Sequence, residues 1–421
     1  MHQEIKQARK RFIAMAVTYF LGVFNDNFFK QAVLLLAVSA GMSGLQGRAT
    51  ELFSLPFILF SAWGGWLADR FVKRRVVIGV KFLELAAMLI GAYGIITVNW
   101  NCVMAMIFLM GLQSTLFGPA LNGSIPELYP SEYVTTANSV LKLVTTIAIL
   151  LGMALAGFAL DLHLMETKIP FGSLVVAGGV VCIALLGVLA SFGVYSRPAT
   201  GGKVPFPWTG PLQSIRELLA LRKDSLLLLA VCCDSFFYFI SLLAVLVINT
   251  LGMEQLGLSK SATSILSVSL MTGVCLGAFA AAKLTTDKRW THVLAPGAIG
   301  MGLCMTGAGL LVTGLAHPGF YPLLLILIGT GFFGGLFLIP VTAFIQIRPT
   351  ADSKGRIIAA SNFSAFLGMW CSGRIFTFMD GAFQPSVSMM LLGTVALIFG
   401  VLLVVFLHRA GGSTPLVRSR N

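Results

Sequence analysis

A carboxylate, two amides and an ammonium group interrupt the first long apolar run of the chain. They are Asn25, Asp26, Asn27 and Lys30. Such groups are costly in a lipid bilayer, so where they persist they usually mark a functional site. Asp26 and Lys30 are four residues apart and are therefore neighbours on one helix face. They can bind a ligand or merely neutralise each other as an internal ion pair, and the central position of Asp26 favours the ligand.

Further ionisable or amide side chains lie inside other apolar runs. Lys81 and Glu84 are three residues apart in the third run, Asn122 lies near the end of the fourth, and Lys142 lies inside the fifth. Asp234 is a fainter copy of the first acid in the second half of the chain. The alternative for the lysines is that their long side chains snorkel to the headgroups. The candidates for binding a substrate or a coupling ion are Asp26, Asn27, Lys30, Lys81, Glu84, Asn122, Lys142 and Asp234.

The composition identifies the elements that must position these residues as membrane helices. Hydrophobic residues make up 57% and charged residues 11% of 421 positions, against roughly 45–50% and 25% in soluble domains. The mean hydropathy is +0.89. Apolar runs of about 20 residues are long enough to cross a hydrocarbon core of about 30 Å. The predicted spans are 12–38, 49–70, 77–97, 101–123, 134–160, 170–195, 224–251, 259–283, 291–316, 320–346, 354–379 and 385–408.

The widest gap between predicted spans divides the chain into two halves. We predict a six-helix bundle at 1–195, a cytoplasmic linker with an amphipathic helix at 196–223, and a second six-helix bundle with a short cytoplasmic tail at 224–421. Pro119 in the fourth span matches Pro340 in the tenth, and Asn138 in the fifth matches Asn362 in the eleventh. Two pseudo-symmetric six-helix halves are the architecture of secondary transporters, whose substrate sites lie near the membrane midplane and whose access alternates.

Basic residues are concentrated in one alternating set of loops. The opposite loops hold only Arg48, Lys168 and Lys260. Because cytoplasmic loops carry an excess of Lys and Arg, we expect both termini in the cytoplasm. The net charge of +13 then follows from topology and from attraction to anionic headgroups. Without a soluble basic domain, a nucleic-acid partner is not expected.

One loop motif resembles a signature of the major facilitator superfamily. The segment between the second and third spans reads GWLADRFVKRR, similar to G-x-L-A-D-R-x-G-R-R/K, with Val72 in place of the second glycine. An acid at one helix end can meet the positive N-terminus of another helix. The resemblance implies that this loop gates a conformational change through Gly65, Asp69, Arg70, Lys73, Arg74 and Arg75.

A more specific resemblance covers about the first 160 residues. It rests on Phe24–Asn27, the Lys81–Glu84 pair, Gly118–Ala120 with Gly123 and Glu127–Leu128, Ala137–Asn138 and Ala148–Gly152. Together these resemble the bacterial lysophospholipid transporter family, in particular the transporter parts fused to acyltransferase–acyl carrier protein synthetase enzymes. The resemblance implies a flippase of the bacterial inner membrane. It would move lipids similar to lysophosphatidylethanolamine from the outer to the inner leaflet by alternating access, for re-acylation inside.

The chain also departs from that family. Leu121 stands where many members carry Lys, and Lys142 where many carry Glu, so one cationic role is expected to have moved between helices. Only thirteen residues follow His408, so we expect the acyltransferase–acyl carrier protein synthetase to be a separate partner. A proton- or sodium-coupled carrier of another small polar or amphipathic solute remains an open alternative, because a fold does not fix a substrate.

The sequence offers little support for catalysis. No His is followed by an Asp five residues later, the spacing of the acyltransferases next to this family. The seven Cys lie in or beside predicted spans without a Cys-x-x-Cys spacing. We therefore expect no enzyme activity, no metal site and no cofactor beyond a coupling sodium ion or proton. Gly329–Gly334 fits G-x-G-x-x-G but lies mid-span without a preceding strand, which predicts helix packing rather than nucleotide binding.

Overall fold

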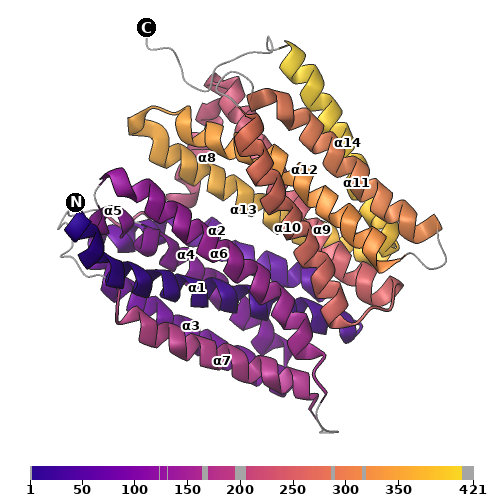
Figure 1. Ribbon diagram of the computed structural model, residues 1–421, viewed down its shortest axis with the longest axis horizontal. Coiled ribbons are helices and arrows are strands. Elements are labelled where there is room, and N and C mark those ends of the chain that lie inside the picture. The colour runs from indigo at the N-terminus through magenta and orange to yellow at the C-terminus, as the bar shows by residue number, and fades with distance from the viewer. Residues whose placement is uncertain are drawn as a thin grey trace. The chain divides into compact units, whose positions relative to one another are not determined.

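Twelve long α-helices make up most of the part of the chain that the computed structural model describes (Figure 1). That part is 2–122, 124–129, 131–163, 169–194, 205–285, 290–314 and 319–409. The long helices are α1 (His2–Ser39), α2 (Leu45–Arg70), α3 (Lys73–Ile96), α4 (Trp100–Asn122), α6 (Ser131–Leu160), α7 (Phe171–Ser191), α9 (Ser225–Thr250), α10 (Lys260–Leu284), α11 (Leu294–Gly314), α12 (Phe320–Ile347), α13 (Ala351–Ala382) and α14 (Pro385–Arg409). The predicted fold class, an all-α membrane protein, is confirmed, and the twelve long helices correspond to the twelve predicted spans.

The predicted spans coincide closely with these helices. The largest difference is at α1, which begins ten residues before the predicted start at 12 because its basic N-terminal segment is also helical. Eleven of the long helices in the described chain are long and apolar enough to cross a membrane. The exception is α13, whose polar and charged residues, Arg374 and Asp380 among them, lower its hydropathy. At 32 residues it is still amply long to span a bilayer.

Short elements fill part of the connections. They are α5 (Ile125–Leu128), α8 (Gly210–Ala220), the 3₁₀ turns η1 (Leu221–Lys223) and η3 (Trp290–Val293), and a π-helical turn, η2 (Leu251–Gln255). Helix α8 lies in the predicted linker, and Pro211 occupies its first turn, where its missing N–H costs nothing. Residue 195, residues 196–204 of that linker and residues 410–421 of the tail lie outside the described part of the chain.

The chain forms two compact units. The first comprises Met1–Leu36 and Leu52–Pro211, and the second comprises Ala37–Glu51 and Leu212–Asn421. The second unit includes the connection between α1 and α2 because that connection packs on α9 and α13. The amide of Asn249 donates to the Gln46 side chain over 2.9 Å, and the Ser43 hydroxyl donates to Asp380 over 2.8 Å.

Glycines allow close helix packing within each unit. A Cβ on Gly273 or Gly277 of α10 would collide with the backbone of α12, and one on Gly331 would collide with the backbone of α10. The prediction that the G-x-G-x-x-G segment serves helix packing is therefore confirmed. In the first unit, a Cβ on Gly64 of α2 would lie 2.5 Å from the carbonyl oxygen of Thr115 in α4.

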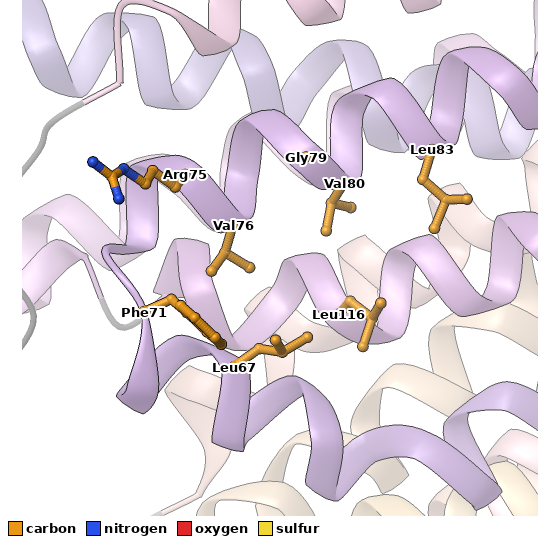
Figure 2. A pocket seen from close by; sticks show the side chains of 8 residues that line it. All are labelled: Leu67, Phe71, Arg75, Val76, Gly79, Val80, Leu83 and Leu116. Carbon is orange, nitrogen blue, oxygen red and sulfur yellow. The ribbon is translucent and has the colours of Figure 1, made fainter. Parts of the chain in front are cut away.

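A groove lies between α2, α3 and α4 in the first unit (Figure 2). It encloses about 340 Å³. Figure 2 shows Val76, Val80 and Leu83 projecting from α3 toward Leu67 of α2 and Leu116 of α4.

Candidate functional site

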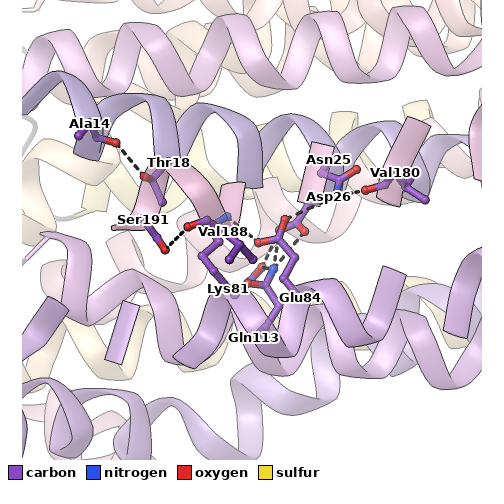
Figure 3. Close-up of polar contacts among 11 residues, drawn as sticks. Ala14, Thr18, Asn25, Asp26, Lys81, Glu84, Gln113, Val180, Val188 and Ser191 are labelled. Atoms are coloured by element: carbon purple, nitrogen blue, oxygen red, sulfur yellow. Dashed lines mark hydrogen bonds and ion pairs between the residues drawn. The ribbon is translucent and has the colours of Figure 1, made fainter. Parts of the chain in front are cut away.

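Asp26 is held by two side chains of α4 (Figure 3). The amide nitrogen of Gln113 donates to both carboxylate oxygens, over 3.1 and 3.2 Å, and the hydroxyl of Ser114 donates to Oδ2 over 2.6 Å. Gln113 also donates to the Ser114 oxygen over 2.8 Å. The carboxylate is thus fixed by hydrogen bonds from two side chains, and no ion pair joins it to a cation in the part of the chain that the structure describes.

A second cluster of polar side chains connects α1, α3 and α7. The ammonium of Lys81 and the carboxylate of Glu84 form an ion pair of 2.5 Å, with 0% and 1% of their side chains exposed. The amide of Asn25 donates to Glu84 Oε1 over 3.5 Å and to the carbonyl oxygen of Val180 over 3.1 Å. Asn25 Oδ1 is buried and accepts no hydrogen bond from the described residues. An open acceptor therefore lies beside a buried ion pair.

The space for Lys81 comes from small neighbours. A Cβ on Gly22 of α1 would lie 2.5 Å from the Lys81 nitrogen, and one on Gly187 of α7 would lie 3.6 Å from it. The ammonium also lies 4.8 Å from the ring centroid of Phe117, a favourable cation–π position. Removing either side chain would leave the other charge buried without a partner, which strongly destabilises a protein. Lys81 and Glu84 therefore stabilise each other.

Lys30 and Asn27 occupy different surroundings from Asp26. The Lys30 ammonium lies 4.9 Å from the ring centroid of Phe53, and no ion pair joins it to Asp26 in the described chain. The internal ion pair considered as the alternative role for these two residues is therefore not formed here. The Asn27 amide donates to the carbonyl oxygen of Val23, one turn earlier in α1, over 2.8 Å.

The acid of the second unit has a simpler environment. Asp234 of α9 is buried, and its Oδ2 accepts from the hydroxyl of Ser361 in α13 over 3.2 Å. One residue later, the Ser235 hydroxyl donates to that of Ser364 over 2.7 Å. The described side-chain hydrogen bonds between α9 and α13 thus join an acid to a hydroxyl and a hydroxyl to a hydroxyl.

The remaining candidates do not join either cluster in the described chain. Lys142 of α6 is exposed, whereas Leu121 of α4 is fully buried in an apolar cluster. The backbone of Asn122 ends α4, and its side chain lies outside the described part of the structure. A cation at position 121 would therefore enter hydrocarbon surroundings rather than the polar clusters.

The expected gating loop is mostly helical. Helix α2 ends at Arg70 and α3 begins at Lys73, so only two residues connect them. Val72 has φ −57° and ψ 116°, a conformation that any residue adopts, which explains why no glycine is needed there. Asp69 and Arg70 are exposed, and Arg74 donates to the carbonyl oxygen of Phe192 over 2.6 Å. This last contact fixes the start of α3 to the end of α7.

Sequence analysis missed the two α4 side chains that hold Asp26. Gln113 and Ser114 are adjacent polar residues in the middle of the predicted fourth span. Their position in the middle of a membrane span indicates that they have a polar partner, because polar groups inside such a span are rarely without one. Asn25 lies in the same polar stretch as Asp26, but the predicted ligands include Asn27 and not Asn25, whose amide bonds to Glu84 and Val180.

The arrangement suits reversible binding of a cation or a zwitterionic group. The first unit offers a fixed carboxylate at Asp26, a cation at Lys30 that lies against an aromatic ring, and an amide oxygen at Asn25 that accepts no hydrogen bond from the described residues. No group of three or more His, Cys, Asp or Glu side chains that could hold a metal ion occurs among the described residues.

Comparisons with known proteins identify the family. The model of the Major Facilitator Superfamily matches residues 12–373. The lysophospholipid transporter LplT of Escherichia fergusonii is 27% identical over 355 residues, covering 83% of each chain, and that of Yersinia enterocolitica is 26% identical over 355 residues, covering 83% of this chain and 82% of the relative.

Solved structures show the same fold. A D-xylose-proton symporter aligns with a TM-score of 0.72 at 14% identity, over 93% of this chain and 96% of the symporter. A structure from a study of proton dependent oligopeptide transporters aligns with a TM-score of 0.73 at 13% identity, over 95% and 98% of the two chains. The protein is a multi-pass membrane protein that belongs to the major facilitator superfamily.

Proposed function

We propose that the protein is a lysophospholipid transporter that moves lipids similar to lysophosphatidylethanolamine from the outer to the inner leaflet of a bacterial inner membrane. The observation that carries the proposal is the similarity to the lysophospholipid transporters, which extends over 83% of the chain. The polar cluster around Asp26, inside apolar helices, supports it, because a zwitterionic headgroup needs charged partners at membrane depth.

Asp26 and Lys30 are the proposed headgroup ligands. They lie one helical turn apart on α1, and the pair offers a carboxylate for an amine and an ammonium for a phosphate. The hydrogen bonds from Gln113 and Ser114 hold the carboxylate in place before the headgroup arrives. The Lys30 ammonium lies against the ring of Phe53 and can move to a phosphate without breaking an ion pair.

Lys81 and Glu84 are proposed to serve coupling rather than headgroup binding. Both side chains are fully buried and already neutralise each other, so neither is free to meet a phosphate or an amine. A sodium ion at Glu84 would lie beside the Lys81 ammonium and be repelled by it. A proton can instead bond to the Glu84 carboxylate itself, which gives a neutral acid and releases Lys81 from the ion pair, so we favour a proton as the coupling ion.

The proposal includes no catalytic step. Both termini would lie in the cytoplasm, in accordance with the basic loops. Re-acylation of the lipid would be carried out by a separate acyltransferase–acyl carrier protein synthetase. Secondary candidates for contact with the substrate are Lys142, Asn122 and Asp234. The candidate for conformational gating is the segment from Gly65 to Arg75, which contains the end of α2 and the start of α3.

Uptake by proteoliposomes tests the proposal. We expect saturable transfer of labelled lysophosphatidylethanolamine to a protected compartment, above protein-free vesicles and competed by unlabelled lysophosphatidylglycerol. A pH gradient should change the rate, and a sodium gradient at constant pH should not. Saturable uptake of sugars or amino acids with no lipid transfer would instead support the alternative, an ion-coupled carrier of a soluble solute.

A further inference from the structure

The groove between α2, α3 and α4 has one charged end and an apolar body. Its lining consists of Leu67, Phe71, Arg75, Val76, Gly79, Val80, Leu83 and Leu116. Every lining residue except Arg75 is apolar, and Figure 2 shows Arg75 at one end of the row of α3 side chains. At about 340 Å³, its volume is at the lower end of the roughly 300–1,000 Å³ of small-molecule sites. None of these residues takes part in the polar clusters around Asp26 and Lys81.

Arg75 is available to an external anion. Its side chain is exposed, and it forms no ion pair within the part of the chain that the structure describes. Its neighbour Arg74 is engaged by the carbonyl oxygen of Phe192. Arg75 is also the third residue of α3, where the helix dipole adds positive potential. A guanidinium in this setting suits a phosphate, which it can contact with two parallel hydrogen bonds.

The apolar body extends away from that cation in one direction. Residues 75, 76, 79, 80 and 83 recur on one face of α3, and eight residues of helix correspond to about 12 Å. A free phosphate would use only the charged end of such a groove. An uncharged apolar molecule would leave the guanidinium unused. A ligand with a phosphate at one end and a hydrocarbon chain behind it uses both.

We propose that this groove binds one acyl chain of an anionic membrane phospholipid, with the lipid phosphate on Arg75. The second chain stays in the bilayer, and the lipid is a bound component of the first unit rather than the transported substrate. The proposal does not depend on the transport function, because it concerns occupancy of the groove alone.

The chain offers a matched pair of glycines for testing occupancy. Gly79 lines the groove, is exposed, and has no atom within 4 Å of a Cβ built on it. A Cβ at position 79 therefore meets no atom, and Gly79→Leu places a larger apolar side chain at the lining of the groove. Gly178 of α7 is also an exposed helical glycine with no atom within 4 Å of a built Cβ, but it lies outside the groove. Gly178→Leu is the control for the same chemical change.

Native mass spectrometry of the full-length, delipidated protein measures the binding directly. The protein is titrated with dioleoylphosphatidylglycerol and, separately, with dioleoylphosphatidylcholine. We expect wild type and Gly178→Leu to bind a first phosphatidylglycerol equally, and Gly79→Leu to bind it at least about tenfold more weakly. Arg75→Gln should reduce phosphatidylglycerol binding about tenfold, to the level of phosphatidylcholine. Millimolar inorganic phosphate should not displace the lipid.

Two outcomes would overturn the proposal. One is equal phosphatidylglycerol binding by Gly79→Leu and Gly178→Leu, which would mean that no chain occupies the groove. The other is displacement of the lipid by inorganic phosphate, which would mean that the Arg75 end alone binds an anion. Thermal melting of each variant checks folding, and if Gly79→Leu does not fold, the exposed Arg75→Gln variant decides the question.

Discussion

Asp26 and Asp234 each belong to the first long helix of their half of the chain, α1 and α9, yet they differ in partners. Asp26 in α1 accepts from an amide and a hydroxyl of α4, whereas Asp234 in α9 accepts from the hydroxyl of Ser361 in α13. Asp26 thus accepts hydrogen bonds from α4, the fourth long helix of the first half, whereas Asp234 accepts one from α13, the fifth long helix of the second half. The two halves therefore differ in the helix that holds this acid.

The surroundings of the two acids differ as well. Near Asp26, the first unit buries the Lys81–Glu84 ion pair completely. The ion pairs described in the second unit are partly exposed, as in Arg348–Asp224 and Arg374–Glu51. Since buried charge is retained only where it has a use or a partner, the comparison indicates that the first unit carries most of the polar chemistry. If so, substitutions of polar residues in the first unit should lower transport more than substitutions in the second.

The largest effect is expected from breaking the buried ion pair. Lys81→Met leaves the Glu84 carboxylate buried without its cation, which typically costs about 3–5 kcal/mol. The double variant Lys81→Met with Glu84→Leu removes both charges and should regain most of the loss in stability but not transport. Thermal unfolding in detergent, measured beside lysophospholipid uptake, separates the two effects. A single variant as stable as wild type would show that the pair is not buried in the membrane.

The next largest loss of uptake is expected from replacing Lys30, the cation one helical turn from Asp26. Lys30→Gln removes the proposed phosphate ligand and should lower uptake of lysophosphatidylethanolamine about tenfold, or about 1.4 kcal/mol. Lys30→Arg keeps the positive charge and its position over Phe53, so it should retain most uptake. Equal uptake by both variants would remove Lys30 from the list of headgroup ligands.

A smaller effect is expected at the second acid. Asp234→Asn keeps a side chain that can accept from Ser361, and we expect uptake to fall by no more than about threefold, or about 0.6 kcal/mol. Uptake assays under the same conditions as for the first unit give the comparison. A loss larger than that of Lys30→Gln would reverse the proposed ranking of the two units.

The smallest effect is expected at Asn27. Its amide donates back to the carbonyl oxygen of Val23 in its own helix, an interaction that the helix backbone does not need. Asn27→Ala should change uptake by less than about twofold. A strong loss would indicate that the side chain leaves Val23 to contact the substrate during transport.

The sequence predicted the helices better than the contacts between them. The spans were found because about twenty apolar residues are needed to cross a bilayer, a requirement that acts on each segment by itself. Asp26, Lys81, Glu84 and Asp234 were found for a related reason, since charge inside an apolar run is conspicuous. The spacing of Lys81 and Glu84 also made their pairing a natural expectation.

The partners of those residues depend on helix rotation and packing, which a single sequence does not specify. Gln113 and Ser114 are uncharged, so they stand out less in an apolar run than Asp26 does, although they donate hydrogen bonds to it. The exposed position of Lys142 and the buried position of Leu121 likewise depend on which face each helix turns inward. The proposed migration of a cation between those two positions stays a prediction, and the burial of Leu121 argues against placing a lysine there.

The Asp26→Asn variant tests the central claim most directly. The change removes the charge but keeps the size of the side chain and an oxygen that can accept from Gln113 or Ser114. Uptake of labelled lysophosphatidylethanolamine is measured in proteoliposomes that contain equal amounts of folded wild-type and variant protein. We predict a loss of at least about tenfold, equivalent to about 1.4 kcal/mol. Wild-type uptake by this variant would contradict the account, because Asp26 would then be a spectator in its own cluster.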